Sequence, residues 1–160
     1  MIKTFNPDFK NTINEKLGRQ FFMQALGFKI TDISEGKIEG ELELQQMHKQ
    51  HKGFVHGGVI ATVADIVMGF SAVSLVPADH HVVTVELKTS YLNPGIGEKL
   101  FAKGWVLKQG RKLNFCEAEV YTISGRNEPV LIAKASSTMA TLTPEDLKQW
   151  AFNNYQWSVI

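Results

Sequence analysis

One apolar segment carries both a candidate anion site and a candidate base or nucleophile. It opens with the pair Gly57-Gly58, and the carboxylate of Asp65 follows eight residues after Gly57 among apolar neighbours. Glycines at a helix start leave backbone N–H groups uncovered at the positive end of the helix dipole, which suits an anion or a developing oxyanion. An unpaired carboxylate in an apolar helix is costly and is therefore a candidate catalytic group. The alternatives are a carboxylate satisfied by hydrogen bonds alone and glycines that only permit close packing.

The spacing of these two groups sets a condition on any reaction that they share. Eight residues of α-helix rise by about 12 Å. One carbonyl group therefore cannot touch both the Gly57 N–H and the Asp65 carboxylate of the same helix, since each must approach within about 3 Å. If both act on one carbonyl, they come from two chains whose central helices run antiparallel across a two-fold axis. The pattern then predicts at least a homodimer with an active site at its interface.

The apolar run from Val59 to Val76 is close to the length of a membrane span. Its one charge, Asp65, lies well inside the run, where insertion into a membrane is penalised by about 2.5–3.5 kcal/mol. No cluster of Lys and Arg flanks either end to set an orientation. We therefore expect a helix buried inside a soluble fold, with no membrane contact. Such a helix needs something large to wrap it.

The rest of the chain predicts strands that can enclose this helix. A helical pattern of apolar residues precedes residue 28, and Gly27 is its expected end. Alternation and turn residues then predict two strands around a turn between Lys29 and Leu44. They predict four further strands, at His81 to Leu92, Lys99 to Gln109, Lys112 to Ile123 and Val130 to Leu142. Short connections predict antiparallel neighbours. This order predicts an α+β protein of hotdog-like architecture, with an antiparallel sheet of about six strands wrapped around a long central apolar helix.

We expect one domain with a short segment at either end. Residues 1–27 are predicted to be an N-terminal helical segment that packs on the domain, residues 28–142 the hotdog domain, and residues 143–160 a C-terminal tail. The tail could start a short helix carrying Trp150, Phe152, Tyr155 and Trp157. In the strand that starts at His81, strict alternation puts Thr84 on the face opposite to Val83, Val85, Leu87, Thr89 and Tyr91.

Composition narrows the partners and cofactors. Seventeen Lys and Arg residues against sixteen Asp and Glu residues give a net charge of +1, so no global field recruits nucleic acid or an anionic membrane. The single cysteine, Cys116, excludes an internal disulfide and is expected to pack in a strand rather than to act as a nucleophile. His48, His51 and His56 lack an acidic or cysteine partner at a recognised spacing, so we predict no metal and no cofactor. The polar start lacks the apolar core of a signal peptide, which predicts a cytoplasmic protein.

The stretch HGGVIATVAD resembles hotdog-fold acyl-CoA thioesterases, most closely the PaaI-like branch of the phenylacetate pathway and its mammalian counterpart. Gly53 before the stretch and the later strand that ends in Tyr-Leu-Asn-Pro-Gly belong to the same resemblance, which covers roughly Phe28 to Leu142. The resemblance implies that the Gly57 amide polarises a thioester carbonyl. It implies that Asp65 acts as a nucleophile or as a base for water. Acyl-CoA is then the expected substrate, and the expected assembly is a dimer or a dimer of dimers.

Three further positions take roles from the resemblance. Gln50 stands where the family often has an asparagine, three residues before the loop glycine, and is the candidate for orienting water or the loop. Thr84 is the matching hydroxyl on the following strand, near the partner carboxylate. His56 is expected to buttress the glycine turn through its ring and not to act as the base.

Gly58 and Phe54 are candidate substrate-binding residues. An apolar pocket for an aromatic or a medium-chain acyl group is suggested by Phe54, Met68, Phe70 and Tyr91.

A cationic turn is the candidate site for the phosphates of coenzyme A. Lys108, Arg111 and Lys112 flank Gly110 between two predicted strands. Related enzymes often meet the nucleotide of CoA with basic residues on outer loops. The alternative is an ordinary solvated hairpin tip, because exposed charges are normal.

The function predicted from these features is hydrolysis of an acyl-CoA thioester to a free acid and CoA. A non-catalytic acyl-CoA-binding hotdog protein is the alternative, although this chain leaves no room for the DNA-binding module of such sensors. An acyl-thioester hydratase is a further alternative. Hydratases of this fold resemble a different motif, in which a histidine and a carboxylate transfer protons, and the Asp65 pattern argues against them.

Overall fold

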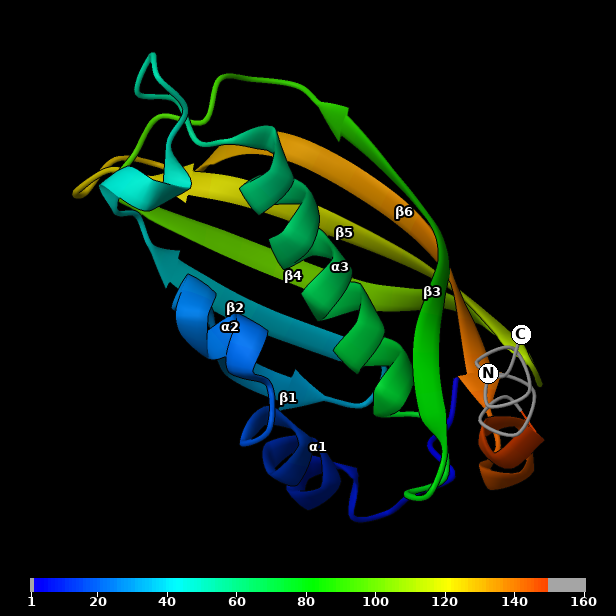
Figure 1. Cartoon of the computed structure of the whole chain (residues 1–160). Helices are drawn as coiled ribbons and strands as arrows, with labels where there is room; N and C mark the ends of the chain where they lie inside the picture. Colours follow the sequence, from blue (N-terminus) through cyan, green and yellow to red (C-terminus); the bar gives the residue numbers. More distant parts are fainter. Residues whose placement is uncertain (1, 150–160) are drawn as a thin grey trace, which may run out of the picture.

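A six-stranded antiparallel sheet curves around one long helix (Figure 1). The computed structural model describes residues 2–149. The strands are β1 (Lys29–Ser34), β2 (Lys37–Glu43), β3 (His81–Tyr91), β4 (Lys99–Gln109), β5 (Leu113–Ile123) and β6 (Val130–Leu142), in the order β1-β2-β4-β5-β6-β3. The helices are α1 (Phe9–Leu17), α2 (Phe21–Leu26) and α3 (Gly57–Val73), with a short 3-10 helix, η1 (Gln46–His48). The predicted α+β hotdog architecture is confirmed.

Helix α3 packs closely against the sheet. Gly104 on β4 permits the close approach, because a Cβ there would lie 2.7 Å from the Val67 carbonyl carbon. The Ser71 hydroxyl lies within hydrogen-bond distance of the carbonyl oxygens of Gly104 (2.9 Å) and Val67 (2.6 Å), so it joins helix to strand. None of the helices in residues 2–149 combines the length and the apolar character that a membrane crossing needs.

One side of α3 is not covered by the sheet. The residues on this side are half-buried and include Thr62, Asp65, Ile66, Gly69 and Val73. They line a cavity between α3, α2 and β3, so the sheet does not bury every side of this helix in the single chain. The reason is that the sheet covers only one side of the helix, while α2 has six residues and covers little of the other.

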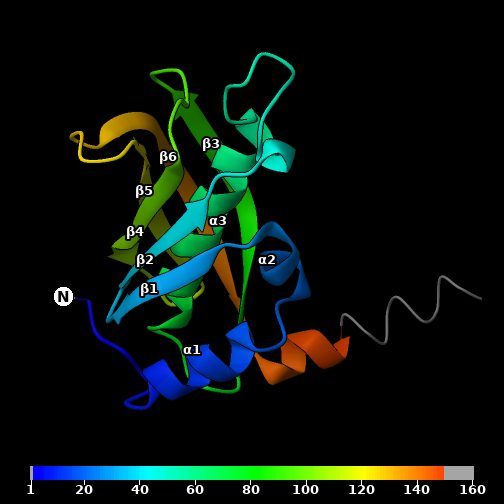
Figure 2. The same ribbon diagram turned by 90° about the vertical axis from the view of Figure 1, so that its left-hand side faces the viewer.

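The N-terminal segment forms two helices instead of one continuous helical pattern. Helix α1 ends at Leu17, and α2 starts at Phe21 after Gly18, a residue that disfavours helix interiors. Gly27 ends α2 in the left-handed conformation (φ 81°), as predicted. Figures 1 and 2 show α2 next to β1, on the same side of the sheet as α3. The assignment of residues 1–27 as a segment separate from the domain stays a prediction.

Strand β3 lies at an edge of the sheet and, within residues 2–149, pairs only with β6. The register shifts between Thr84 and Glu86, so Val85 is the extra residue of a β-bulge. The bulge brings Thr84 and Leu87 to the same side, where both line the cavity beside α3. The strict alternation expected for this strand, which put these two residues on opposite faces, is therefore wrong.

The C-terminal tail begins with a helical turn over residues 144–149. Thr143 caps it, because the Thr143 hydroxyl accepts a 3.1 Å hydrogen bond from the Asp146 N–H, and the Thr143 N–H donates a 2.9 Å hydrogen bond to Asp146 Oδ2 in return. The aromatic residues predicted on this helix, Trp150, Phe152, Tyr155 and Trp157, lie outside the described residues.

Candidate active site

The first turn of α3 presents a free backbone donor. His56 is the N-cap residue, and its Nδ1 accepts a 3.0 Å hydrogen bond from the Gly58 N–H. Among residues 2–149 no atom accepts a hydrogen bond from the Gly57 N–H. The ring of His56 therefore satisfies one donor of the helix start and leaves the donor of Gly57 at the positive end of the helix dipole.

The loop before α3 is held in shape by short-range hydrogen bonds. The Gly53 N–H donates to the Gln50 carbonyl and the Gln50 N–H to the Phe54 carbonyl, both at 2.8 Å. Gly53 has a φ of 84°, which favours glycine at this position. The His56 N–H donates to the carbonyl of His48, a buried residue whose Nε2 lies 3.0 Å from the Leu26 carbonyl oxygen. The loop is thus tied through His48 to the end of α2.

Tyr91 is a site residue that the sequence placed only in a general apolar pocket. Its hydroxyl donates a 2.9 Å hydrogen bond to the Gly57 carbonyl. A Cβ built at Gly57 would lie 3.3 Å from the Tyr91 ring and hydroxyl, a tight contact that favours glycine. The sequence feature that could have identified Tyr91 as a site residue is its position immediately before the Leu-Asn-Pro-Gly turn.

Four of the predicted site residues meet at one hollow of about 580 Å³. Gln50 and Phe54 of the loop line it together with Gly57 and Gly58 of α3, and Tyr91 closes one side. Asn93 also lines it, and its amide is held by a 2.8 Å hydrogen bond to the Leu131 carbonyl. The hollow therefore surrounds the free N–H of Gly57 with both polar and apolar groups.

The Asp65 carboxylate is half-buried and faces a separate cavity. Its Oδ1 accepts a 2.8 Å hydrogen bond from the Thr84 hydroxyl of the same chain. The role of Thr84 in a site built from two chains stays a prediction, and the contact that the structure shows lies within one chain. It exists because the bulge at Val85 turns Thr84 toward α3.

The cavity beside Asp65 has a volume of about 460 Å³ and mostly apolar walls. Phe70, one of the predicted pocket residues, lines it, whereas Met68 is fully buried in the core. Helix α2 supplies Phe22 and Met23, which were not predicted as site residues. The cavity and the Gly57 hollow have no lining residue in common. A single chain therefore does not bring Gly57 and Asp65 to one carbonyl, as the helix rise between them predicted.

The cationic turn lies away from both groups within the chain. Lys108, Arg111 and Lys112 are exposed at the β4–β5 hairpin. Arg111 lines a third cavity, of about 480 Å³, with Val76 and His80, which follow the C-terminal end of α3. The turn is thus at the opposite end of α3 from Gly57.

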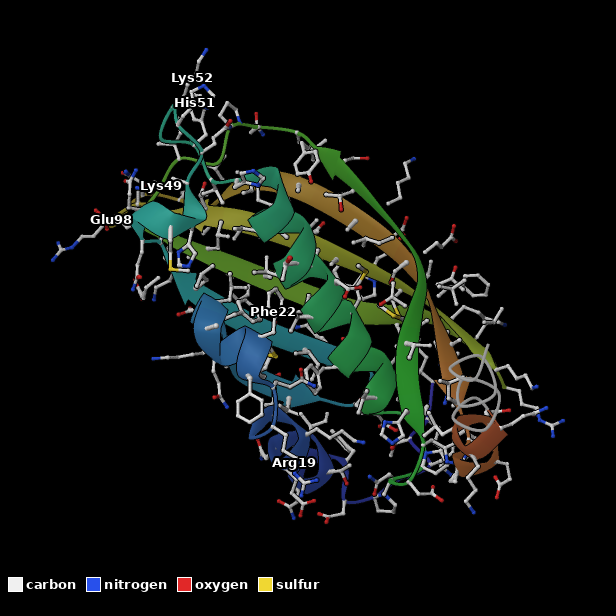
Figure 3. All side chains as sticks on the ribbon, viewed as in Figure 1. Arg19, Phe22, Lys49, His51, Lys52 and Glu98 are labelled. Atoms are coloured by element: carbon white, nitrogen blue, oxygen red, sulfur yellow. The ribbon has the colours of Figure 1, made fainter. Side chains whose placement is uncertain are left out.

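Other candidate groups are engaged in packing or lie on the surface. Cys116 is buried, and burial raises the pKa of its thiol to about 12, so it is protonated at neutral pH. Figure 3 shows His51 and Lys52 at the outer tip of the loop before α3. Within residues 2–149 no three His, Cys, Asp or Glu side chains gather in a way that could hold a metal ion.

One family model and several known proteins are similar to this chain. Residues 52–128 match the model described as the thioesterase superfamily. A human protein named acyl-coenzyme A thioesterase 13 is 32% identical over 104 residues, which cover 62% of this chain and 71% of the human protein. A Caenorhabditis elegans protein named putative esterase F42H10.6 is 32% identical over 112 residues, or 69% of this chain, and the match spans 64% of that protein's length. A crystal structure of a thioesterase family protein from Silicibacter pomeroyi has a TM-score of 0.82 and 31% identity, over 84% of this chain and 98% of that chain.

Proposed function

Because this chain belongs to the thioesterase superfamily, a family of hotdog-fold thioester hydrolases, we propose that it hydrolyses an acyl-CoA to a free acid and CoA. The observation that carries the proposal is the Gly57 N–H, which has no acceptor among residues 2–149 and opens into a hollow at the positive end of α3. A donor of this kind stabilises the oxyanion that forms when a thioester carbonyl is attacked.

The reaction needs a second group, and Asp65 is the candidate. The carboxylate of Asp65 either attacks the thioester carbon or takes a proton from a water that attacks it. The C–S bond then breaks, and CoA leaves as a thiolate that gains a proton. If Asp65 attacks, the acyl group is left as a mixed anhydride with its carboxylate, and a water then hydrolyses this anhydride to the free acid and restores the carboxylate. If Asp65 activates a water, the oxygen of that water becomes part of the free acid directly. The Thr84 hydroxyl holds one carboxylate oxygen, so the other oxygen can point toward the reaction.

We propose that each site is completed by two chains of a homodimer. Gly57 of one chain then faces Asp65 of the partner subunit, because the two groups of one chain line separate cavities. The outer edge of β3, which no strand within residues 2–149 covers, supports this assembly. Its apolar side chains are exposed in the single chain, where Val83 is 44% and Val85 61% accessible. An exposed apolar edge strand is a pairing surface.

The remaining residues take supporting roles in this proposal. His56 and Tyr91 fix the backbone at Gly57 from its two sides. Gln50 lines the same hollow, where its amide can orient water. Lys108, Arg111 and Lys112 are proposed to bind the phosphates of CoA, which stand outside the acyl site.

The test is a panel of acyl-CoA substrates with a reagent for free thiols. Release of CoA thiol and free acid supports the proposal. Hydration of a double bond without thiol release would indicate a hydratase. Saturable binding without turnover would indicate a non-catalytic acyl-CoA-binding protein, and either result would overturn the proposed activity.

A further inference from the structure

The cavity beside Asp65 follows α3 in the direction of its C-terminal end. Its lining residues on α3 lie on one side of the helix, at spacings of three or four residues, and include Thr62, Asp65, Ile66, Gly69 and Val73. From Asp65 to Val73 the helix rises by about 12 Å. The volume of about 460 Å³ lies in the range of small-molecule sites. A ligand group that fits this space is long and apolar.

Gly69 keeps the floor of the cavity clear. It lies one turn after Asp65, or about 6 Å along the helix axis. A Cβ built at Gly69 would have no heavy atom within 4 Å, and the φ angle of Gly69 is not positive. Neither packing nor backbone conformation within the described residues therefore requires glycine there. Because glycine destabilises a helix interior relative to alanine, its effect at this position is to leave space.

Phe22 forms the wall opposite β3. Its side chain is 63% exposed although it lines the cavity, and Figure 3 shows it between α2 and α3. The neighbouring Phe21 is 76% exposed and does not line the cavity, while Met23 anchors α2 in the core. An aromatic ring beside an open apolar cavity buries more of its surface when an apolar ligand fills that cavity. Phe22 lies outside residues 52–128, which match the family model.

We propose that this cavity binds an unbranched acyl chain, and that Gly69 as its floor and Phe22 as its wall set the chain-length selectivity. The inference rests on the proposed function, which puts the thioester carbonyl beside Asp65. An extended alkyl chain advances about 1.3 Å per C–C bond, so it passes Gly69 after about four or five carbons and reaches Val73 after about nine. The exposed residues Gln20 and His81 line the cavity as well, and there it opens to solvent.

The experiment compares catalytic efficiency, kcat/KM, across CoA thioesters from acetyl to palmitoyl. In the wild-type protein kcat/KM rises with chain length by up to about fourfold per methylene until about eight to ten carbons. Gly69→Leu blocks the floor, so efficiency for octanoyl-CoA falls at least tenfold while that for acetyl-CoA and butyryl-CoA changes less than twofold. Phe22→Ala flattens the rise with chain length. Phe21→Ala, the matched control, leaves the profile unchanged.

Binding of non-hydrolysable alkyl-CoA thioethers separates this inference from the proposed activity. If no acyl-CoA is hydrolysed, but thioether affinity rises with alkyl length in the wild type and not in Gly69→Leu, the acyl site stands and the proposed activity fails. Thermal unfolding and light scattering of each variant check the fold and the assembly. Gly69→Ala serves as a milder change in case the leucine variant does not fold.

Three results would overturn the inference. The first is an identical chain-length profile, in hydrolysis and in thioether binding, for the wild type and both Gly69 variants. The second is an equal loss for all substrates together with loss of the dimer, which would make Gly69 and Phe22 contacts between subunits. The third is phenylacetyl-CoA as the best substrate with octanoyl-CoA among the poorest, which would assign the cavity to an aromatic acyl group.

Discussion

The Thr84 hydroxyl on β3 donates a 2.8 Å hydrogen bond to the Asp65 carboxylate on α3. The same hydroxyl lies 3.4 Å from the sulfur of Met139, so Thr84 is held between the helix and β6. One oxygen of the carboxylate is thereby fixed, and its orientation depends on a residue of a different element. This arrangement is what a positioned base or nucleophile requires.

Asp65→Asn is expected to leave the fold intact and to lower kcat by about 10²–10⁴-fold. Asparagine keeps the shape and can still accept from Thr84, but it neither attacks a carbonyl nor takes a proton at neutral pH. Thiol release on the best substrate and far-UV circular dichroism are the measurements. A variant that retains most of the wild-type kcat would remove Asp65 from the mechanism.

Thr84→Val is expected to lower kcat by about tenfold, because the hydrogen bond that orients Asp65 is lost while the volume of the side chain is kept. Thr84→Ser keeps the hydroxyl and is the matched control. Equal activity of the valine and serine variants would show that the hydrogen bond has no part in catalysis.

Mixed dimers of Asp65→Asn and Gly57→Val chains are expected to regain activity that neither variant has alone. A side chain at Gly57 would meet the Tyr91 ring, so valine disrupts the oxyanion donor, while each mixed dimer keeps one intact site. Random mixing at equal concentrations makes half of the dimers mixed with one of two sites working, or about a quarter of wild-type activity. Inactivity despite proven subunit exchange would rule out a site shared between chains.

Arg111→Ala is expected to raise KM a fewfold for acyl-CoA and to leave kcat unchanged. A contact with the nucleotide is remote from the carbonyl and contributes uniform binding, and an exposed ion pair is worth about 1 kcal/mol or less. The control substrate is the pantetheine thioester, which lacks the nucleotide phosphates. An equal rise in KM for both substrates would make this turn an ordinary solvated hairpin.

Glu119 on the outer face of the sheet is expected to make stability depend on acid pH. Hydrogen bonds from Lys103, Lys134 and Tyr121 lower the pKa of the Glu119 carboxyl from 4.5 to about 2. The lowered pKa means that its stabilisation is present above pH 4.5 and is lost as the pH falls from 4.5 through 2. Glu119→Gln is expected to lower the free energy of unfolding by about 1 kcal/mol at pH 7, in urea titrations. A gap between variant and wild type that does not shrink toward pH 2 would contradict this.

Much of the site could be predicted from the sequence because it is local along the chain. The rise of an α-helix is a property of the backbone, so the roughly 12 Å between Gly57 and Asp65 follows from their spacing alone. Apolar periodicity and turn residues likewise predicted the six strands and the start of α3 at Gly57. The hollow that gathers Gln50, Phe54, Gly57 and Gly58 is formed by neighbours in sequence, apart from the later strand and turn that close it.

The contacts between distant elements were decided by the tertiary structure. A bulge at Val85 puts Thr84 beside Asp65, and strict alternation cannot reveal where a strand gains an extra residue. Phe22 lines the Asp65 cavity because α2 is a separate helix after Gly18, whereas the apolar spacing indicated one continuous pattern. Periodicity shows which face of an element is apolar, but the same face can pack against several partners. Which partner a face packs against is decided by strand register and by close approaches such as that of Gly104 to Val67, and these exist only in the folded chain.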